Sequence, residues 1–312
     1  MTSRPRRLMV LDTASLYFRA FFGVPDSMRA PDGTQVNAVR GLLDFIGRLV
    51  STHEPTDLIC AWDDDWRPQW RVDLIPTYKA HRVVRAIPDG VDVEETPDPL
   101  EVQIPMIEIV LEAFGIAVVG AAEHEADDVI GTLSRQFAGA VDIVTGDRDL
   151  FQLVADERDV RVLYVARGVG NLDVVDEGWV VRKYGILPEQ YADFATLRGD
   201  ASDGLPGVKG VGEKTAASLL QQYGDLAGIV AAAADPTTSM ATGLRAKLVA
   251  AADYLAVAPT VVEVVCDLDL PEVDSALVPL TEERSATVAE LTKRWGLGSS
   301  AGRVTEALAA YA

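Results

Sequence analysis

The chain has 312 residues, 48% of them hydrophobic, and a formal net charge of −20 from 28 basic and 48 acidic residues. This length supports one large or two modest domains with proper cores, and no apolar stretch approaches the ~20 residues that a membrane helix needs. The acidity argues against a non-specific nucleic-acid binder, although bound cations would offset it and basic residues can still gather on one face.

The N-terminal apolar run extends only from Leu8 to Leu11 before Asp12, which is too short for a signal peptide. The two cysteines, Cys60 and Cys266, lie in apolar surroundings and are predicted to be buried free thiols. We therefore expect a soluble cytoplasmic protein with no membrane association.

Four short apolar runs in the first half of the chain are predicted strands: "LMVLD", "LICAWD", "IAVVG" and "VDIVTGDRD". Segments with helical periodicity lie between them, at about 37–51, 101–114 and 126–137. This alternation predicts an α/β fold, with a mostly parallel central sheet flanked by helices. Ligands of such sheets bind beyond the carboxyl ends of the strands, where three of these runs end in aspartate.

Residues 80–100 interrupt the alternation, with three prolines and five acidic residues and no long periodic pattern. Two interpretations stay open, a solvated loop or a flexible element beside a functional site. After about residue 185, Ala-rich and Leu-rich helical patterns predict a smaller helical domain. The tail has a strand-like "TVVEVVCDLDL", a helix over 281–295 and a short final helix after "GLGSS". We expect an α/β core over 1–184, a helical domain over 185–262 and a C-terminal segment over 263–312 that packs back on the core.

The stretch "EHEADDVIG", residues 123–131, concentrates carboxylates at the start of a predicted helix. Helix capping is one explanation, because the helix dipole favours acids in the first turn by roughly 0.3–1 kcal/mol each. A metal site is the other, and it needs carboxylates from elsewhere in the chain. The strand-end aspartates supply them, and the full candidate set is Asp12, Asp63, Glu125, Asp127, Asp128, Asp147, Asp149, Asp200 and Asp203.

Carboxylates gathered this densely would repel one another unless cations join them. Oxygen ligands without histidine or cysteine select Mg²⁺ or Mn²⁺ over Zn²⁺. Two such ions about 3.5–4 Å apart are a common device for displacement at a phosphoryl centre. Basic side chains near the acids, Arg19, Lys79 and Arg82, suit a phosphate substrate.

A second motif is "GLPGVKGVGEKTAASLL", residues 204–220. Its glycines predict a tight turn between two helices, and the exposed N–H groups that open the second helix form an anion site. This pattern is typical of a helix-hairpin-helix that grips a nucleic-acid backbone without reading bases. The predicted contact residues are Gly207, Lys209, Gly210, Gly212, Lys214 and Thr215.

Together these stretches resemble the 5′-nuclease (flap endonuclease) family, in particular the 5′–3′ exonuclease domain of bacterial DNA polymerase I and its free-standing paralogues. The motifs that carry the resemblance are "VLDTASLYFRAF", "AWDDD", "YKAHR", "EADD", "TGDRDLFQL" and "GDASDGLPGVKGVGEKTA". The chain departs from the family in having "SDG" at 202–204, where "SDN" is usual.

The resemblance implies a PIN/resolvase-like core, a helical arch over about 79–104 and a helical DNA-binding domain. It implies that Lys79, Arg82 and Arg19 act at the scissile phosphate, that the nine acids bind two or more Mg²⁺ or Mn²⁺ ions, and that the hairpin often holds K⁺. The implied partner is duplex DNA with a 5′ flap or 5′ end, or an RNA–DNA hybrid, bound by a monomer without a polymerase domain.

Two other functions stay open at this point. A ribonuclease on a similar acid-lined core needs only about four acids, so the larger acid set and the hairpin count against it. A catalytically inactive binder of DNA junctions predicts gaps in the acid set, and none is found.

Overall fold

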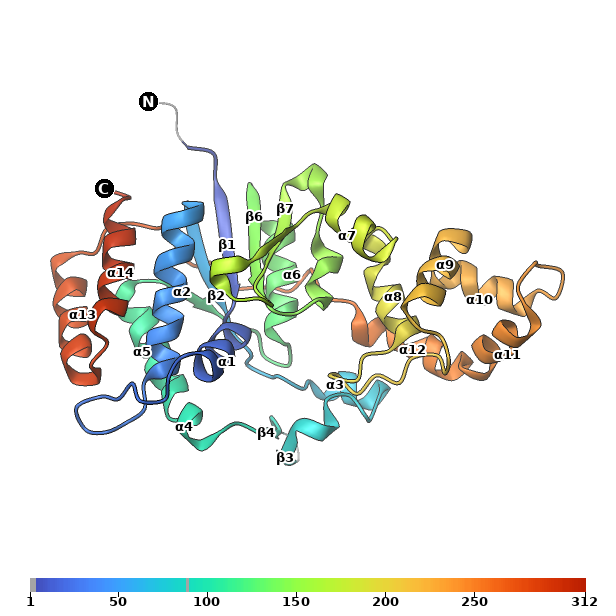
Figure 1. Cartoon of the computed structure of the whole chain (residues 1–312), viewed down its shortest axis with the longest axis horizontal. Coiled ribbons are helices and arrows are strands. Elements are labelled where there is room, and N and C mark those ends of the chain that lie inside the picture. Colours follow the sequence, from blue (N-terminus) through green and yellow to red (C-terminus); the bar gives the residue numbers. More distant parts are fainter. Residues whose placement is uncertain (1–3, 88–89) are drawn as a thin grey trace.

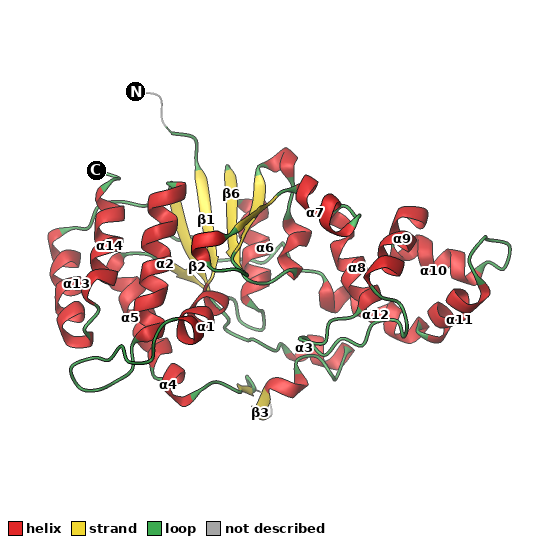
Figure 2. Ribbon diagram, viewed as in Figure 1, coloured by secondary structure: helices red, strands yellow, loops and turns green. Residues whose placement is uncertain are grey.

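The computed structural model describes residues 4–87 and 90–312, and its centre is a six-stranded sheet with the order β5-β2-β1-β6-β7-β8 (Figures 1 and 2). All neighbouring pairs are parallel except β7 and β8. The strands of this sheet are β1 Arg7–Asp12, β2 Asp57–Ala61, β5 Ala117–Val119, β6 Ala140–Thr145, β7 Val160–Tyr164 and β8 Asp173–Val175. The predicted mostly parallel sheet is confirmed.

The two faces of the sheet are covered by different helices. Alternation along β1 sends Leu8 and Val10 toward α6, and Met9 and Leu11 toward α1 and α2. The helices around the sheet are α1 Thr13–Gly23, α2 Asn37–His53, α3 Gln69–Leu74, α4 Asp98–Glu101, α5 Gln103–Phe114, α6 Ala126–Gln136, α7 Glu177–Tyr184, α13 Glu282–Trp295 and α14 Gly298–Ala309. The predicted helices at 37–51, 101–114 and 126–137 correspond to α2, α5 and α6.

A helical domain extends from one end of the core (Figure 1). Its helices are α8 Tyr191–Arg198, α9 Glu213–Tyr223, α10 Leu226–Ala234, α11 Thr242–Ala250 and α12 Ala252–Val262. Short 3-10 turns occur at η1 Ala80–Arg82, η2 Asp149–Leu153, η3 Asp156–Arg158, η4 Val169–Asn171 and η5 Pro188–Gln190. In the described part of the chain, no helix is both long enough and apolar enough to cross a membrane.

The segment at 79–104 differs from the predicted helical arch. Its described residues form an antiparallel strand pair, β3 Val83–Arg85 and β4 Val93–Glu94, followed by α4, a helix of four residues. Positions 88 and 89 lie outside the described residues. Pro97 and Pro99 restrict the backbone before α5 and prevent a long helix there. Arg67 pairs with Asp92 at 2.6 Å and fastens the strand pair to the core.

The strand predicted from "TVVEVVCDLDL" is absent. Its first residues complete α12, and the rest runs extended along α6 without joining a sheet. Side chains of α6 take the place of a partner strand, because Thr132 accepts from the Leu268 N–H at 3.3 Å and Gln136 donates to the Leu268 carbonyl at 3.0 Å. The chain then crosses beside β2, where Leu58 N donates to Ser275 O at 2.8 Å, and ends in α14 packed on α2.

Candidate active site

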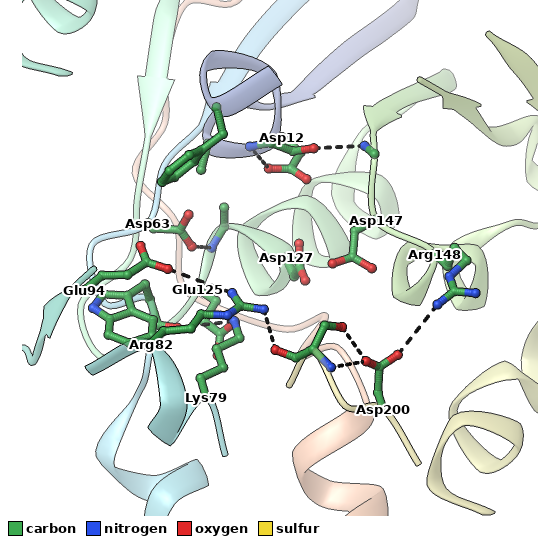
Figure 3. A pocket seen from close by; sticks show the side chains of 17 residues that line it. Asp12, Asp63, Lys79, Arg82, Glu94, Glu125, Asp127, Asp147, Arg148 and Asp200 are labelled. Atoms are coloured by element: carbon green, nitrogen blue, oxygen red, sulfur yellow. Dashed lines mark hydrogen bonds and ion pairs between the residues drawn. The ribbon is translucent and has the colours of Figure 1, made fainter. Parts of the chain in front are cut away.

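A cavity of about 370 Å³ lies at the carboxyl ends of the central strands. Figure 3 shows carboxylates entering it from several sides. Six of the nine predicted acids line it, and we call it the acid pocket: Asp12, Asp63, Glu125, Asp127, Asp147 and Asp200. Asp12, Asp63 and Asp147 lie at or just after the ends of β1, β2 and β6. Glu125 and Asp127 lie at the start of α6, and Asp200 follows α8, so segments more than a hundred residues apart in sequence meet at one place.

One hydroxyl group ties the ends of β1 and β6 together. Thr145 Oγ1 donates to Asp12 Oδ2 at 2.6 Å and accepts from the Asp147 N–H at 2.8 Å. Asp12 also caps α1, accepting from Ser15 N at 3.1 Å. Burial raises the pKa of Asp12 to about 7, against the Thr145 hydrogen bond and with help from the charge of Asp63.

The first residues of α6 order the other side of the pocket. Asp63 accepts from the Ala126 N–H at 2.8 Å. Glu125 accepts from Tyr78 at 2.7 Å and pairs with Lys79. Burial opposes ionisation of Glu125, but the charges of Lys79 and Arg71 outweigh it and lower its pKa. Glu125 is therefore held as a compensated carboxylate.

The pKa of Asp127 is shifted in the opposite direction to that of Glu125. Burial raises its pKa well above the usual range, and the charges of Asp147 and Asp12 raise it further. Burial likewise raises the pKa of Asp63. The pocket therefore holds more negative charge than its basic residues neutralise, and a hard cation would relieve this repulsion.

The donor set fits Mg²⁺ or Mn²⁺ by its chemistry, since all the candidate ligands are carboxylate oxygens. Within residues 4–87 and 90–312, no three acidic, histidine or cysteine side chains converge tightly enough to hold one ion by themselves. In proteins, Mg²⁺ commonly binds one or two carboxylates and completes its shell with water and substrate oxygens. The candidate ligands are Asp127 and Asp147, with Asp12 and Asp63, whose charges repel one another in the pocket.

Three predicted ligands do not line the pocket. The Asp149 N–H donates to Asp147 Oδ1 at 2.9 Å, and the pKa of the Asp149 carboxyl is raised by burial and by the charges of Asp147 and Asp203. Asp203 pairs with Arg82 at 3.0 Å. Asp128 is fully buried and faces away from the cavity.

Asp128, which was predicted as a metal ligand, has both of its oxygens occupied by donors from the protein. Arg71 donates to them at 2.7 and 2.9 Å, and Val265 N donates to Oδ1 at 2.9 Å. Asp128 Oδ2 also accepts from the Glu125 N–H at 3.3 Å, which is a helix cap. Helix capping therefore explains one acid of "EADD", and the pocket explains two.

The predicted basic residues occupy three different environments. Lys79 lines the pocket in a left-handed conformation, with φ of 47°, which is a strained backbone for a residue with a side chain. Arg82 also lines it and donates to the Ser202 carbonyl at 2.7 Å. Arg19 does not line it: its guanidinium donates to the Ala166 carbonyl at 3.2 Å, beside Gly146.

Several residues of the site were not predicted from the sequence. Glu94 lines the pocket from β4 and lies 3.9 Å from Arg82. Arg148 also lines the pocket, and its guanidinium is 4.0 Å from Asp200. In the sequence it stands between two of the predicted metal ligands. The position of Arg148 inside "GDRD" was an available signal, whereas nothing local marked Glu94 or the buried Arg71.

The glycine-rich motif forms an exposed turn between α8 and α9, as predicted. Gly207 and Gly210 have φ of 63° and 77°. A side chain at Gly207 would come within 2.6 Å of the Arg198 carbonyl, so only glycine fits there. Lys209 and Lys214 are exposed, and Gly212 precedes the first turn of α9, which contains Thr215. Lys247 donates to the Gly210 carbonyl at 3.0 Å.

The raised pKa values predict how the metal-free protein responds to pH. A carboxyl whose pKa is raised by folding stabilises the fold while it is protonated, and this contribution is lost as pH rises through the folded value, about 7 for Asp12. In EDTA, we expect the melting temperature to fall between pH 5 and pH 8. Mg²⁺ should raise it more at pH 8 than at pH 5. Calorimetry of Asp127→Asn beside the unmodified protein checks this, since the variant should show a flatter pH profile; equal profiles would contradict the prediction.

Two family models match consecutive parts of the chain. Residues 7–185 match "5'-3' exonuclease, N-terminal resolvase-like domain", and residues 186–283 match "5'-3' exonuclease, C-terminal SAM fold". The junction between the two matches coincides with the beginning of the helical domain.

Full-length relatives and a solved structure agree with these matches. A 5'-3' exonuclease of Streptomyces coelicolor is 59% identical over 97% of this chain and 100% of its own length. A 5'-3' exonuclease of Mycobacterium tuberculosis is 50% identical over 96% of this chain and 97% of its own. The bacteriophage T5 D15 flap endonuclease, solved as a complex with DNA and metal ions, has the same fold with a TM-score of 0.62 at 14% identity, covering 97% of this chain and 99% of the phage chain.

Proposed function

The chain belongs to the 5′-3′ exonuclease family, and on this premise we propose that it is a structure-specific, metal-dependent 5′ nuclease. It hydrolyses phosphodiesters of DNA, as a 5′–3′ exonuclease and as a flap endonuclease. The observation that carries the proposal is the acid pocket, in which six carboxylates from distant segments meet beside Lys79 and Arg82.

Divalent cations, when bound, supply Lewis-acid polarisation of the phosphate and activation of water. Asp127 and Asp147 would hold them, with Asp12 and Asp63 as further ligands. Three of these carboxylates are oriented before substrate arrives: Thr145 donates to Asp12, the Ala126 N–H donates to Asp63, and the Asp149 N–H donates to Asp147. Little reorganisation is then needed when charge develops in the transition state.

The basic residues of the pocket bind and orient the phosphate. Lys79 is held by Glu125, and Arg82 is held by Asp203 and the Ser202 carbonyl. Their fixed positions would place positive charge beside the non-bridging oxygens. Arg19 is held beside Gly146 by the Ala166 carbonyl. We propose that it supports the phosphate-binding residues indirectly and does not bind the phosphate itself.

Cleavage of a 5′-labelled flap duplex tests the proposal, with Mg²⁺, Mn²⁺ or EDTA, and with Asp147→Asn beside the unmodified protein. We expect metal-dependent cuts near the flap junction that the variant does not make. Cutting that survives EDTA or the substitution would refute the metal-site assignment. Binding without cutting would favour a junction binder, and cutting of RNA strands alone would favour a ribonuclease.

Finer features of the function are part of the same proposal. The substrate is duplex DNA with a 5′ flap or 5′ end, RNA primers paired with DNA are also cut, and Mg²⁺ or Mn²⁺ occupies the site. The protein acts as a monomer, with the nuclease core over 1–184, the DNA-binding domain over 185–262 and the tail over 263–312. K⁺ binds the hairpin carbonyls, so DNA affinity should be higher in KCl than in LiCl at equal ionic strength.

The exposed lysines of the hairpin give a further prediction. Lys209→Ala/Lys214→Ala removes two cations from the turn without touching the core. Affinity for duplex DNA should fall by about tenfold at moderate salt, and the salt dependence should lose about two units of slope. Fluorescence anisotropy over a salt series measures both. An unchanged slope would mean that the hairpin does not contact phosphates.

A further inference from the structure

A second cavity, of about 640 Å³, has one lining residue in common with the acid pocket. It lies between β7, the turn after it and α7, close to where the helical domain begins (Figure 1). We call it the basic–aromatic pocket after the seven side chains that define it: Arg148, Arg167, Arg182, Lys183, Tyr164, Trp179 and Tyr184. Arg148 alone of these lines both cavities.

The charge of this pocket is opposite to that of its neighbour. Four lining side chains are cationic, and Asp173 is the one acid among them. Two of the ion pairs they make are exposed: Arg167 lies 2.5 Å from Asp173, and Arg182 lies 3.9 Å from Asp176 with 71% of its side chain exposed. Exposed pairs contribute little and exchange easily with another anion. In a chain with a net charge of −20, this gathering of cations marks a surface for a polyanion.

Aromatic rings form the other part of the lining. Tyr164 and Trp179 pack edge-on against the buried Phe151, with ring centroids 5.0 and 5.4 Å away. Tyr184 lies 6.2 Å from Trp179. Packing on one buried ring fixes these half-buried side chains, so binding would cost them little conformational entropy. Aromatic faces beside arginines are the combination on which unpaired bases stack.

We propose that the basic–aromatic pocket binds an unpaired nucleotide of the DNA substrate strand, with its phosphate on Arg182 and Lys183 and its base on the aromatic rings. This inference rests on the proposed nuclease function. Continuity with the acid pocket supports it, because Arg148 follows Asp147 directly and reaches 4.0 Å from Asp200. A strand that leaves the catalytic acids past Arg148 enters the second cavity. An acidic protein segment would meet the same cations but has no bases for the rings.

A charge-matched pair of variants tests the inference. Arg182→Ala/Lys183→Ala removes two exposed cations from the last turn of α7, and Lys293→Ala/Arg294→Ala removes two from the last turn of α13, away from both cavities. Binding of a 5′-flap duplex is measured by anisotropy with Ca²⁺ in place of Mg²⁺. The α7 variant should bind about tenfold more weakly with a shallower salt slope, and the α13 variant should bind like the unmodified protein.

A crosslink locates the base directly. 5-Iodouracil is placed at successive positions on either side of the scissile linkage, and irradiation should attach one of them to the peptide that contains Trp179. Equal affinities of the two variants, or no crosslink there, would overturn the inference while flap cleavage by the unmodified protein still upholds the nuclease. Millimolar mononucleotide is then added as a competitor. If it suppresses the crosslink but leaves flap binding intact, the pocket binds the released product, and the inference is also overturned.

Discussion

Asp127→Asn is expected to abolish cleavage and, at the same time, to stabilise the metal-free fold. Asp127 is a half-buried carboxylate whose pKa is raised by desolvation and by the charges of Asp147 and Asp12. Asparagine removes the repelling charge and keeps the shape, so the melting temperature in EDTA at pH 8 should rise by ~1–2 °C, which corresponds to about 1 kcal/mol in a chain of this size. Cleavage should fall by ~10³-fold or more, because a ligand of the catalytic cations is lost.

Asp142→Asn is the matched control for this variant. Asp142 is a fully buried acid of β6 that pairs with Arg7 at 2.8 Å and Arg161 at 2.7 Å and does not line the pocket. Its replacement should lower the melting temperature and leave cleavage unchanged at temperatures where the protein is folded. If Asp127→Asn destabilises the metal-free protein as Asp142→Asn does, the account of an overcharged pocket is wrong.

Asp128→Asn should destabilise the protein and leave most of the cleavage activity, which is the reverse of the result expected for the adjacent Asp127→Asn. Arg71 is only 3% exposed, and it donates to both Asp128 oxygens, lies 3.0 Å from Glu125 and donates to the Val261 carbonyl of α12 at 3.2 Å. Removing one charge of such a buried pair costs roughly 3–5 kcal/mol of unfolding free energy. Cleavage by the folded fraction should fall by less than ~10-fold, because Asp128 does not reach the pocket.

Urea unfolding and single-turnover cleavage of the same preparations check this prediction. The double variant Arg71→Met/Asp128→Leu should recover much of the lost stability, since it replaces the buried pair by apolar side chains of similar size. Wild-type stability of Asp128→Asn combined with a ~10³-fold loss of cleavage would restore Asp128 to the metal ligands.

The contrast between these neighbours shows what the sequence could and could not predict. Strand runs that end in Asp12, Asp63 and Asp147 predicted the pocket, because parallel strands bring their carboxyl ends to one edge. Consecutive residues of a helix point about 100° apart, so Asp127 and Asp128 point in different directions. Their spacing therefore allowed one ligand and one cap, but only the position of Arg71, 57 residues away in the sequence, decides which is which.

The misplaced elements have a similar cause. The "TVVEVVCDLDL" segment has the composition of a strand, yet side chains of α6 satisfy part of its backbone in place of a partner strand. The segment at 79–104 pairs as strands because Asp92 is held by Arg67 and Trp66. No local sequence pattern predicts these contacts. Local periodicity predicted the elements that bury one face, and it failed where side chains from distant segments satisfy the backbone.

The measurement that tests the central claim most directly is cleavage of a flap substrate with sulfur in place of one non-bridging oxygen at the scissile phosphate. Hard Mg²⁺ binds sulfur poorly, whereas Mn²⁺ accepts it more readily. If cations held by Asp127 and Asp147 contact that phosphate, sulfur should slow cleavage by at least ~10-fold in Mg²⁺, and Mn²⁺ should restore most of the rate. Equal effects of sulfur with both metals, for both stereoisomers, would contradict a phosphodiesterase in which this pocket brings metal ions onto the scissile phosphate.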